Sequence, residues 1–183
     1  MRRFLCLLCL AGLLSACSSL PQSGNTAQDS GQHWRLEGKL GITTPKESVS
    51  GFVSWKQNDG QYLINVSGPL GSGAIEIEGT PLMITLRQGN REISSESPEA
   101  LIYDQLGWFF PVRHLQYWVQ GQVSPYAAID KQTLNGQRLE HLWQDNWEVE
   151  YFRWDEYHQL PSKIRISQGD WRFMLVIKQW NQG

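Results

Sequence analysis

The sequence predicts a mainly β protein: one strongly bent antiparallel sheet with two short helices inserted in the middle of the chain. Apolar and polar residues alternate in many segments, as they do between Trp34 and Ile42, and this period of two is typical of strands with one buried face. Turn-forming residues separate the segments, so successive strands lie side by side and antiparallel. The pattern gives roughly nine or ten strands, a number at which a twisted sheet curls or closes.

Each predicted strand is a run of alternating residues. The runs cover residues 34–42, 49–55, 62–66, 75–78, 82–86, 139–143, 147–151, 163–166 and 171–177. The turns between them are clearest at residues 58–60, 88–90, 144–146 and 168–170, where Gln, Asn, Asp and Gly gather. Since no internal repeat or low-complexity block interrupts this order, we expect residues 33–183 to form a single domain.

A helical insert is predicted at about residues 97–121. Ser97 followed by Pro98 is typical of a helix N-terminus, and Gly107 is placed to end that helix. A second helix is predicted over residues 111–119. The apolar face of this second helix is formed by Val112, Leu115, Trp118 and Val119. Two short helices inserted in mid-sheet are expected to lie across an open edge or end of the curved sheet as a lid.

The N-terminus has the pattern of a lipoprotein signal peptide over residues 1–16. Two arginines precede an apolar run over residues 4–14, which is too short to span a bilayer but typical of a secretory signal. The small residues before Cys17 resemble the lipobox of bacterial lipoproteins, in which cleavage leaves the cysteine at the new N-terminus for acylation. Cleavage would also remove Cys6 and Cys9, so the mature chain would have one cysteine and no internal disulfide.

Residues 17–32 are predicted to be an acylated cysteine followed by a polar tether. The segment from Ser18 to Gln32 has almost no apolar residues, as expected of a flexible linker. The residue after the cysteine is Ser18 and not Asp, which in Gram-negative lipoprotein sorting resembles the signal for the outer membrane. We therefore expect an anchor in the outer membrane on its periplasmic face.

Composition and charge narrow the class of protein. The chain has 183 residues, of which 40% are hydrophobic, so it is neither a membrane bundle nor a disordered chain. Its net charge is −2, and loss of Arg2 and Arg3 with the signal leaves 14 basic residues against 18 acidic ones, or −4. A nucleic-acid footprint is therefore absent, and charge alone would not hold the chain on an anionic membrane. Nine Trp residues indicate an apolar surface or cavity whose edges are exposed to solvent.

Four stretches of the chain resemble one family. They are W-x-L-x-G-K-L-G-I from residue 34, S-G-F-V-S-W-K-Q from residue 50, S-G-P-L-G-S-G-A from residue 67 and L-G-W-F-F-P-V-x-x-L-x-Y-W-V-x-G from residue 106. With the lipobox, they are similar to the LolB family of outer-membrane receptors for lipoproteins, over a range from Cys17 to the C-terminus. The resemblance implies an unclosed antiparallel β-barrel, or half-barrel, with a helical lid over an apolar cavity. Family members often carry a helix before the first strand, and residues 18–32 are too short and polar to form a convincing one.

The resemblance also implies a function. A LolB protein accepts acylated lipoproteins from the soluble periplasmic carrier LolA and inserts them into the outer membrane, where its own lipid at Cys17 anchors it. It is not an enzyme and needs no cofactor, and we expect a monomer. The leucine of the P-L-G loop protrudes in this family and mediates membrane delivery, and Leu70, between Pro69 and Gly71, matches it. The alternative is that Leu70 folds back onto the sheet.

An acyl-binding cavity would be lined by large apolar side chains from the inner faces of the strands and helices. The candidate lining residues are Trp34, Trp55, Tyr62, Ile75, Trp118, Trp147, Tyr151 and Trp171. For each of them the alternative is an ordinary filled core. A barrel with this number of strands is able to hold a small ligand, which favours a cavity for the set as a whole.

Catalytic and metal sites find little support in the sequence. Glu76 and Glu78, like Glu148 and Glu150, face away from the apolar side, and a solvated exterior explains both pairs. The four His residues are far apart and lack metal-ligand spacing, and there is no G-x-S-x-G or phosphate-binding motif. A Ser-His-Asp arrangement in space stays open, because triads are defined by geometry. The alternatives to a receptor are an accessory outer-membrane lipoprotein that docks an envelope complex without carrying lipid, and a lipid hydrolase.

Overall fold

The chain folds into eleven strands and two α-helices within residues 33–182, the part that the computed structural model describes. Tight turns join many of the strands. In the turn at Asp59-Gly60, both residues have left-handed backbone, with φ of 45° and 81°, as a two-residue hairpin loop requires. The elements are β1 (Trp34–Thr43), β2 (Ser48–Asn58), β3 (Gln61–Ser67), β4 (Ile75–Gly79), β5 (Ile84–Gln88), β6 (Arg91–Ser95), α1 (Pro98–Leu106), α2 (Val112–Trp118), β7 (Ile129–Asn135), β8 (Arg138–Gln144), β9 (Trp147–Asp155), β10 (Leu160–Gln168) and β11 (Trp171–Gln182).

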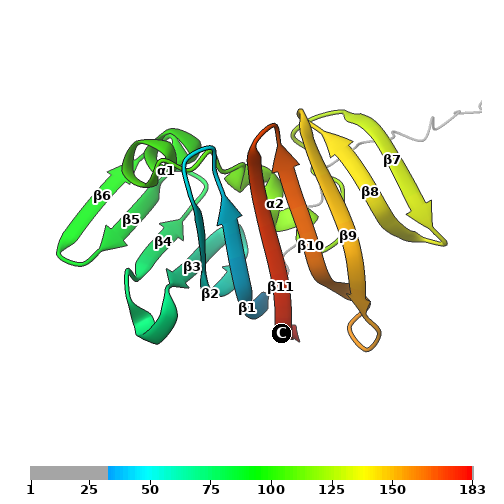
Figure 1. Cartoon of the computed structure of the whole chain (residues 1–183), viewed down its shortest axis with the longest axis horizontal. Helices are drawn as coiled ribbons and strands as arrows, with labels where there is room; N and C mark the ends of the chain where they lie inside the picture. Colours follow the sequence, from blue (N-terminus) through cyan, green and yellow to red (C-terminus); the bar gives the residue numbers. More distant parts are fainter. Residues whose placement is uncertain (1–32, 183) are drawn as a thin grey trace, which may run out of the picture.

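The strands form one antiparallel sheet that bends but does not close. Their order is β6-β5-β4-β3-β2-β1-β11-β10-β9-β8-β7, so the first and last strands pair in the middle of the sheet (Figure 1). Strands β6 and β7 are its two edges, and the helical insert connects them. This confirms the predicted unclosed antiparallel sheet with two inserted helices.

A bulge at the centre of the sheet helps to bend it. The register between β1 and β11 shifts between Glu37 and Gly38, and bulges increase local twist. A Cβ atom at Gly38 would lie 2.3 Å from the carbonyl oxygen of Val176. Because only glycine lacks that atom, Gly38 lets β1 and β11 approach closely enough to pair.

The two edge strands are the ones that the alternation pattern did not predict. Strand β6 has no buried residue, and β7 is almost entirely exposed, so neither needs one apolar face. Charged side chains such as Lys131 suit an edge strand, because they oppose pairing with another chain. The predicted start of a strand at Leu82 was also wrong: Leu82 lies in an exposed turn, and β5 begins at Ile84.

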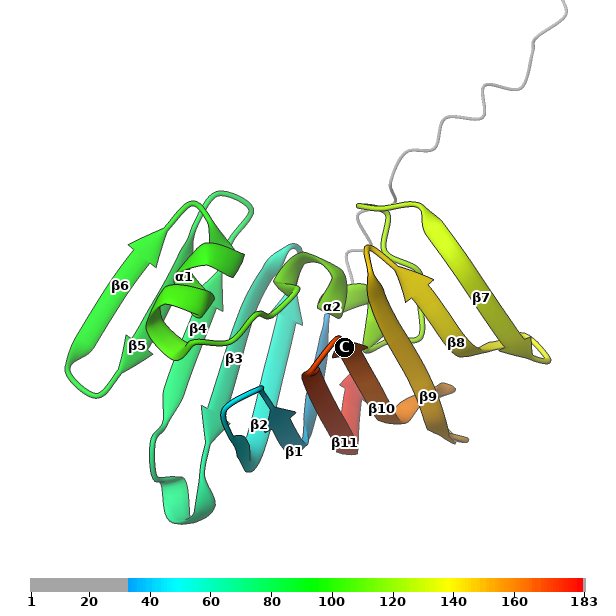
Figure 2. The ribbon, with the colours of Figure 1, turned by 45° about the horizontal axis from the view of Figure 1, so that its top comes forward.

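Both helices lie on the inner side of the bent sheet, with α1 beside β5 and β6 and α2 nearer the middle (Figure 2). Helix α1 begins after Ser97 and ends at Gly107, whose φ is 66°, as predicted from these two residues. The predicted apolar face of the second helix is buried in full. Its members are Val112, Leu115, Trp118 and Val119.

The outer face of the sheet is polar and rich in ion pairs. Arg87 of β5 contacts Glu76, Glu78 and Glu92 at 2.8–2.9 Å, so the two β4 carboxylates belong to the surface as predicted. Glu150 is a correction to that prediction. It is only 8% exposed because it pairs with Arg165 on the neighbouring strand β10.

Candidate functional site

An apolar cavity lies between the inner face of the sheet and the helical insert. Every side chain that lines it is apolar. The lining residues are Leu36, Leu40, Val53, Trp55, Ile64, Val66, Ile77, Ile102, Trp108, Phe110, Leu115, Val119, Ile166, Phe173 and Leu175. Such a wall offers no hydrogen bond to a ligand, so the chemistry that it suits is that of a hydrocarbon chain.

The cavity is almost completely filled in this structure. Its free volume is about 40 Å³, whereas ligand sites for small molecules typically enclose roughly 300–1,000 Å³. A hydrocarbon chain therefore enters only when some of the lining side chains move out. The sheet residues are held by strand pairing on both sides, and the residues contributed by the insert are not. We therefore expect the insert to be the part that moves.

The insert fills the cavity from one side. Its contributions come from α1, from the loop that joins the helices, and from α2. They are Ile102, Trp108, Phe110, Leu115 and Val119. The ring of Phe110 packs edge-on against Phe173 of β11, with centroids 5.0 Å apart. This aromatic contact closes the loop over the sheet.

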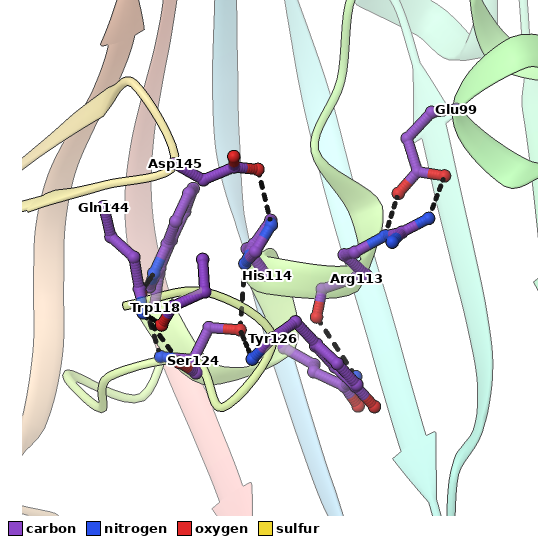
Figure 3. Close-up of polar contacts among 10 residues, drawn as sticks. Glu99, Arg113, His114, Trp118, Ser124, Tyr126, Gln144 and Asp145 are labelled. Atoms are coloured by element: carbon purple, nitrogen blue, oxygen red, sulfur yellow. Dashed lines mark hydrogen bonds and ion pairs between the residues drawn. The ribbon is translucent and has the colours of Figure 1, made fainter. Parts of the chain in front are cut away.

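Buried hydrogen bonds fix α2 to β8 and to the segment after α2 (Figure 3). The side-chain oxygen of Gln144 accepts from Nε1 of Trp118 at 2.9 Å and from the backbone nitrogen of Ser124 at 3.1 Å. The amide nitrogen of Gln144 donates to the carbonyl oxygens of Ser124 and Ala127. The Tyr151 hydroxyl donates to the carbonyl oxygen of Trp118 at 3.0 Å, and burial raises the pKa of Tyr151. Breaking these bonds would leave buried polar groups unpaired.

His114 of α2 lies between Ser124 and Asp145 in a Ser-His-Asp arrangement (Figure 3). Its Nδ1 is 2.9 Å from the Ser124 hydroxyl, and its Nε2 is 3.0 Å from the Asp145 carboxylate. Burial lowers the pKa of His114, and Asp145 offsets this only in part. A catalytic nucleophile must be accessible to the substrate carbonyl. Ser124 is only 1% exposed, so its hydroxyl is not accessible in this way. The cluster instead ties α2 to the turn between β8 and β9.

Helix α1 is held differently. Its side chains Leu101 and Ile102 are buried in the hydrophobic core. Its link to α2 is the Glu99–Arg113 ion pair, with 3.1 Å between Oε1 and Nε, and this pair is largely exposed. Exposed pairs of this kind contribute about 0–1 kcal/mol. Helix α1 and the following loop are therefore easier to displace than α2.

The predicted lining residues surround the cavity more than they line it. Trp55 is the one member of the predicted set among the lining residues, and the other seven lie in the core or at its margin. Trp34, for example, packs against Trp55 and Trp180 with centroid distances of 5.2 and 5.5 Å. The lining is mainly aliphatic, with Trp108, Phe110 and Phe173 added. Trp108 and Phe110 lie in the L-G-W-F-F-P stretch that resembles the LolB family, and this resemblance could have identified them as lining residues.

Leu70 stands at the tip of a loop between β3 and β4. Pro69, Leu70 and Gly71 form a single 3₁₀ turn there, and the Leu70 side chain is fully exposed. The alternative in which Leu70 folds back onto the sheet is therefore wrong. Its backbone is left-handed, with φ of 57°, a conformation that is costly for leucine. An apolar side chain held in water on a strained backbone points to a role outside folding.

The predicted signal peptide, Cys17 and the polar tether lie outside the described residues, as does the question of a helix before β1. Within residues 33–182, no three His, Cys, Asp or Glu side chains gather into a metal site. No helix in the same range is long and apolar enough to cross a membrane.

Comparisons with known proteins agree on one family. Residues 32–180 match the family described as outer membrane lipoprotein LolB. The chain belongs to the LolB family. The outer-membrane lipoprotein LolB of Stutzerimonas stutzeri is 40% identical, with 94% of this chain and 92% of the relative covered. The LolB proteins of Pseudomonas fluorescens strain Pf0-1 and Pseudomonas aeruginosa strain PAO1 are 39% and 41% identical, over 97% and 80% of this chain and 92% and 73% of the relatives.

The fold of this LolB protein is also found in a more distant structure. A LolA superfamily protein from Nitrosomonas europaea has a TM-score of 0.50 and 6% sequence identity, over 83% of this chain and 86% of the other. At that identity, the likeness concerns the fold alone. The two proteins therefore share an overall fold with very little sequence identity.

Proposed function

We propose that this LolB protein is a receptor of the outer membrane, which takes acylated lipoproteins from the periplasmic carrier LolA and inserts them into the membrane. In this role it acts as a monomer and catalyses no reaction. The observation that carries the proposal is the cavity: its lining is entirely apolar, and a separate helical insert covers it. An acyl chain is the ligand that such a wall suits.

The energetics of transfer fit this role. Each methylene of an acyl chain that leaves water is worth about 0.8 kcal/mol. A chain that passes from one apolar cavity to another, and then into a bilayer, stays out of water throughout. Each step therefore has a small free-energy difference, and transfer does not need a nucleotide.

Entry of an acyl chain requires the insert to open, and the contacts described above indicate where. Helix α2 stays in place because Gln144 and His114 tie it to β8 and its turn. Helix α1 and the loop over residues 107–111 swing away, taking Ile102, Trp108 and Phe110 out of the cavity. The predicted lining residue Trp55 remains as a wall on the sheet side.

Delivery to the membrane falls to the Pro69–Gly71 turn and the N-terminal lipid. Leu70 would enter the bilayer, while the acyl groups on Cys17 hold the protein at the membrane. Cys17 lies 16 residues before His33, and an extended chain of that length spans at most roughly 50–60 Å. Strand β3 begins at the end of the sheet where His33 lies and runs to the Leu70 loop. It has 7 residues, which corresponds to a length of roughly 23 Å. The tether is long enough for both to reach one membrane.

A photo-crosslinking experiment tests the cavity. The Cys17→Ala chain, secreted with a cleavable leader in place of residues 1–16, is mixed with a palmitoylated lipopeptide that carries a diazirine at the end of its acyl chain. After irradiation, we expect adducts on cavity residues such as Leu115, Ile166 and Phe173, and excess unlabelled lipopeptide should suppress them. Adducts confined to exposed residues of the outer face, such as Phe152, would contradict the proposal.

A further inference from the structure

A second hollow lies outside the lid, at the seam between the helical insert and the ends of the strands. Its volume is about 560 Å³, within the range of roughly 300–1,000 Å³ that is typical of ligand sites. The turns β2–β3 and β4–β5 form one wall, and the start of α1 with the outer side of α2 forms the other. We call this hollow the seam groove; its main residues are Tyr62, Leu82, Met83, Arg113, Gln116 and Tyr126.

The seam groove adjoins the apolar cavity at one side chain. Trp55 lines both spaces, so its ring is the partition between them. Val112, on the buried face of α2, lines the groove side of the same partition. A ligand whose acyl chain lies in the cavity would pass Trp55 and continue into the groove.

We propose that the seam groove binds the peptide segment that follows the acylated cysteine of a cargo lipoprotein. This inference rests on the proposed function, since it assumes that the cavity takes the acyl chains. A lipoprotein has its acyl groups and its peptide joined at one residue. When the acyl groups are inside the cavity, the peptide must leave through an adjoining opening, and the groove adjoins it at Trp55.

The groove has the chemistry of a peptide site. Leu82, which is 82% exposed, and Met83 present apolar surface to the solvent, while Gln116 and Arg113 supply polar groups on the opposite wall. The turn that carries Leu82 and Met83 is rigid, because the Thr80 hydroxyl oxygen accepts from both of their backbone nitrogens at 3.3 and 3.1 Å. This wall of the groove is formed before binding, so it loses little entropy on binding.

The position of the groove also suits a peptide that must stay in water. The groove lies at the start of β3, and the Leu70 loop lies just after the end of β3. The two sites are therefore at opposite ends of the sheet. With Leu70 in the bilayer, the groove would face the periplasm, where the folded part of the cargo remains while its acyl chains enter the membrane.

The test compares two ligands on two variants of the secreted Cys17→Ala chain. The ligands are palmitic acid and a tripalmitoylated cysteine followed by a serine-rich peptide, and their Kd values are measured by calorimetry. The groove variant is Leu82→Ser combined with Met83→Ser. The matched control is Tyr157→Ser, which removes a side chain that is 89% exposed in the β9–β10 turn, outside the groove.

We expect the groove variant to raise the Kd of the lipopeptide about tenfold and to leave that of palmitic acid unchanged, with no effect of the control on either. An unchanged lipopeptide Kd would overturn the inference. So would an equal loss for both ligands, because the two residues would then act on the cavity. If the groove variant binds the lipopeptide normally but accepts cargo from LolA more slowly, the groove is a contact site for the carrier, and the inference is overturned. If neither ligand binds the parent chain, the proposed function itself fails.

Discussion

Replacing Leu70 separates folding from delivery, because the side chain stabilises nothing in the described fold. Leu70 is fully exposed with φ of 57°, and left-handed backbone costs about 1–2 kcal/mol for most residues but less for asparagine. We expect Leu70→Asn to raise the free energy of unfolding by about 0.5–1 kcal/mol, or the Tm by about 2 °C. The same change removes a leucine whose burial in hydrocarbon is worth about 1.5–3 kcal/mol, which corresponds to a loss of roughly ten- to hundredfold in contact with the membrane.

The assay follows cargo from the loaded Cys17→Ala chain into liposomes, alongside thermal unfolding of the same protein. Leu70→Asn should accept cargo normally and deliver it roughly ten- to hundredfold more slowly. Leu134→Asn, which replaces an exposed leucine on β7, is the matched control and should deliver at the parent rate. Unchanged delivery by Leu70→Asn would refute the membrane role of the loop, and a lowered Tm would refute the strain argument.

Three other changes test the lid, its histidine and the anchor. Gln144→Met removes the partner of three buried groups and one partly buried group, so the free energy of unfolding should fall by about 3 kcal/mol or more in urea titrations. A loss below about 1 kcal/mol would mean that Gln144 does not hold α2 in place. Because burial lowers the pKa of His114, the unfolded chain gains its proton first, near the ordinary pKa of about 6.5. Stability should therefore be complete above that pH and fall as the pH is lowered below it, and His114→Gln should flatten this fall between about pH 7 and pH 5; an equal fall in both proteins would assign it to other groups. Cys17→Ala with a cleavable leader should appear in the soluble periplasmic fraction, and a membrane-bound product would show that acylation is not the anchor.

The interior of the fold follows from the sequence, and its edges do not. Strands such as β1 and β11 bury one face, so their residues must alternate, and alternation is visible in the sequence. Edge strands β6 and β7 bury little, which removes that constraint together with the signal. The helices were predictable because Pro98, Gly107 and the apolar face of α2 are local features.

The cavity was harder to predict than the core around it. Large aromatic rings such as Trp34 and Trp180 pack against one another, and a site filled in this way leaves no room for a ligand. The actual lining depends on which aliphatic side chains end short of the lid, and this is decided by contacts between distant segments. The same is true of Gln144. In the sequence it is an ordinary residue beside a turn, and its importance comes from Trp118 of α2, which lies 26 positions away and donates a hydrogen bond to it.

Transfer of cargo from the carrier distinguishes a lipoprotein receptor from a protein that only shares its fold. The secreted Cys17→Ala chain is mixed with LolA loaded with a triacylated lipoprotein, and pull-down shows which protein holds the cargo. We expect the cargo to move to this LolB chain and not to return to LolA. Cargo that stays on the carrier would contradict this expectation, and would favour an accessory lipoprotein that has the same fold but carries no lipid.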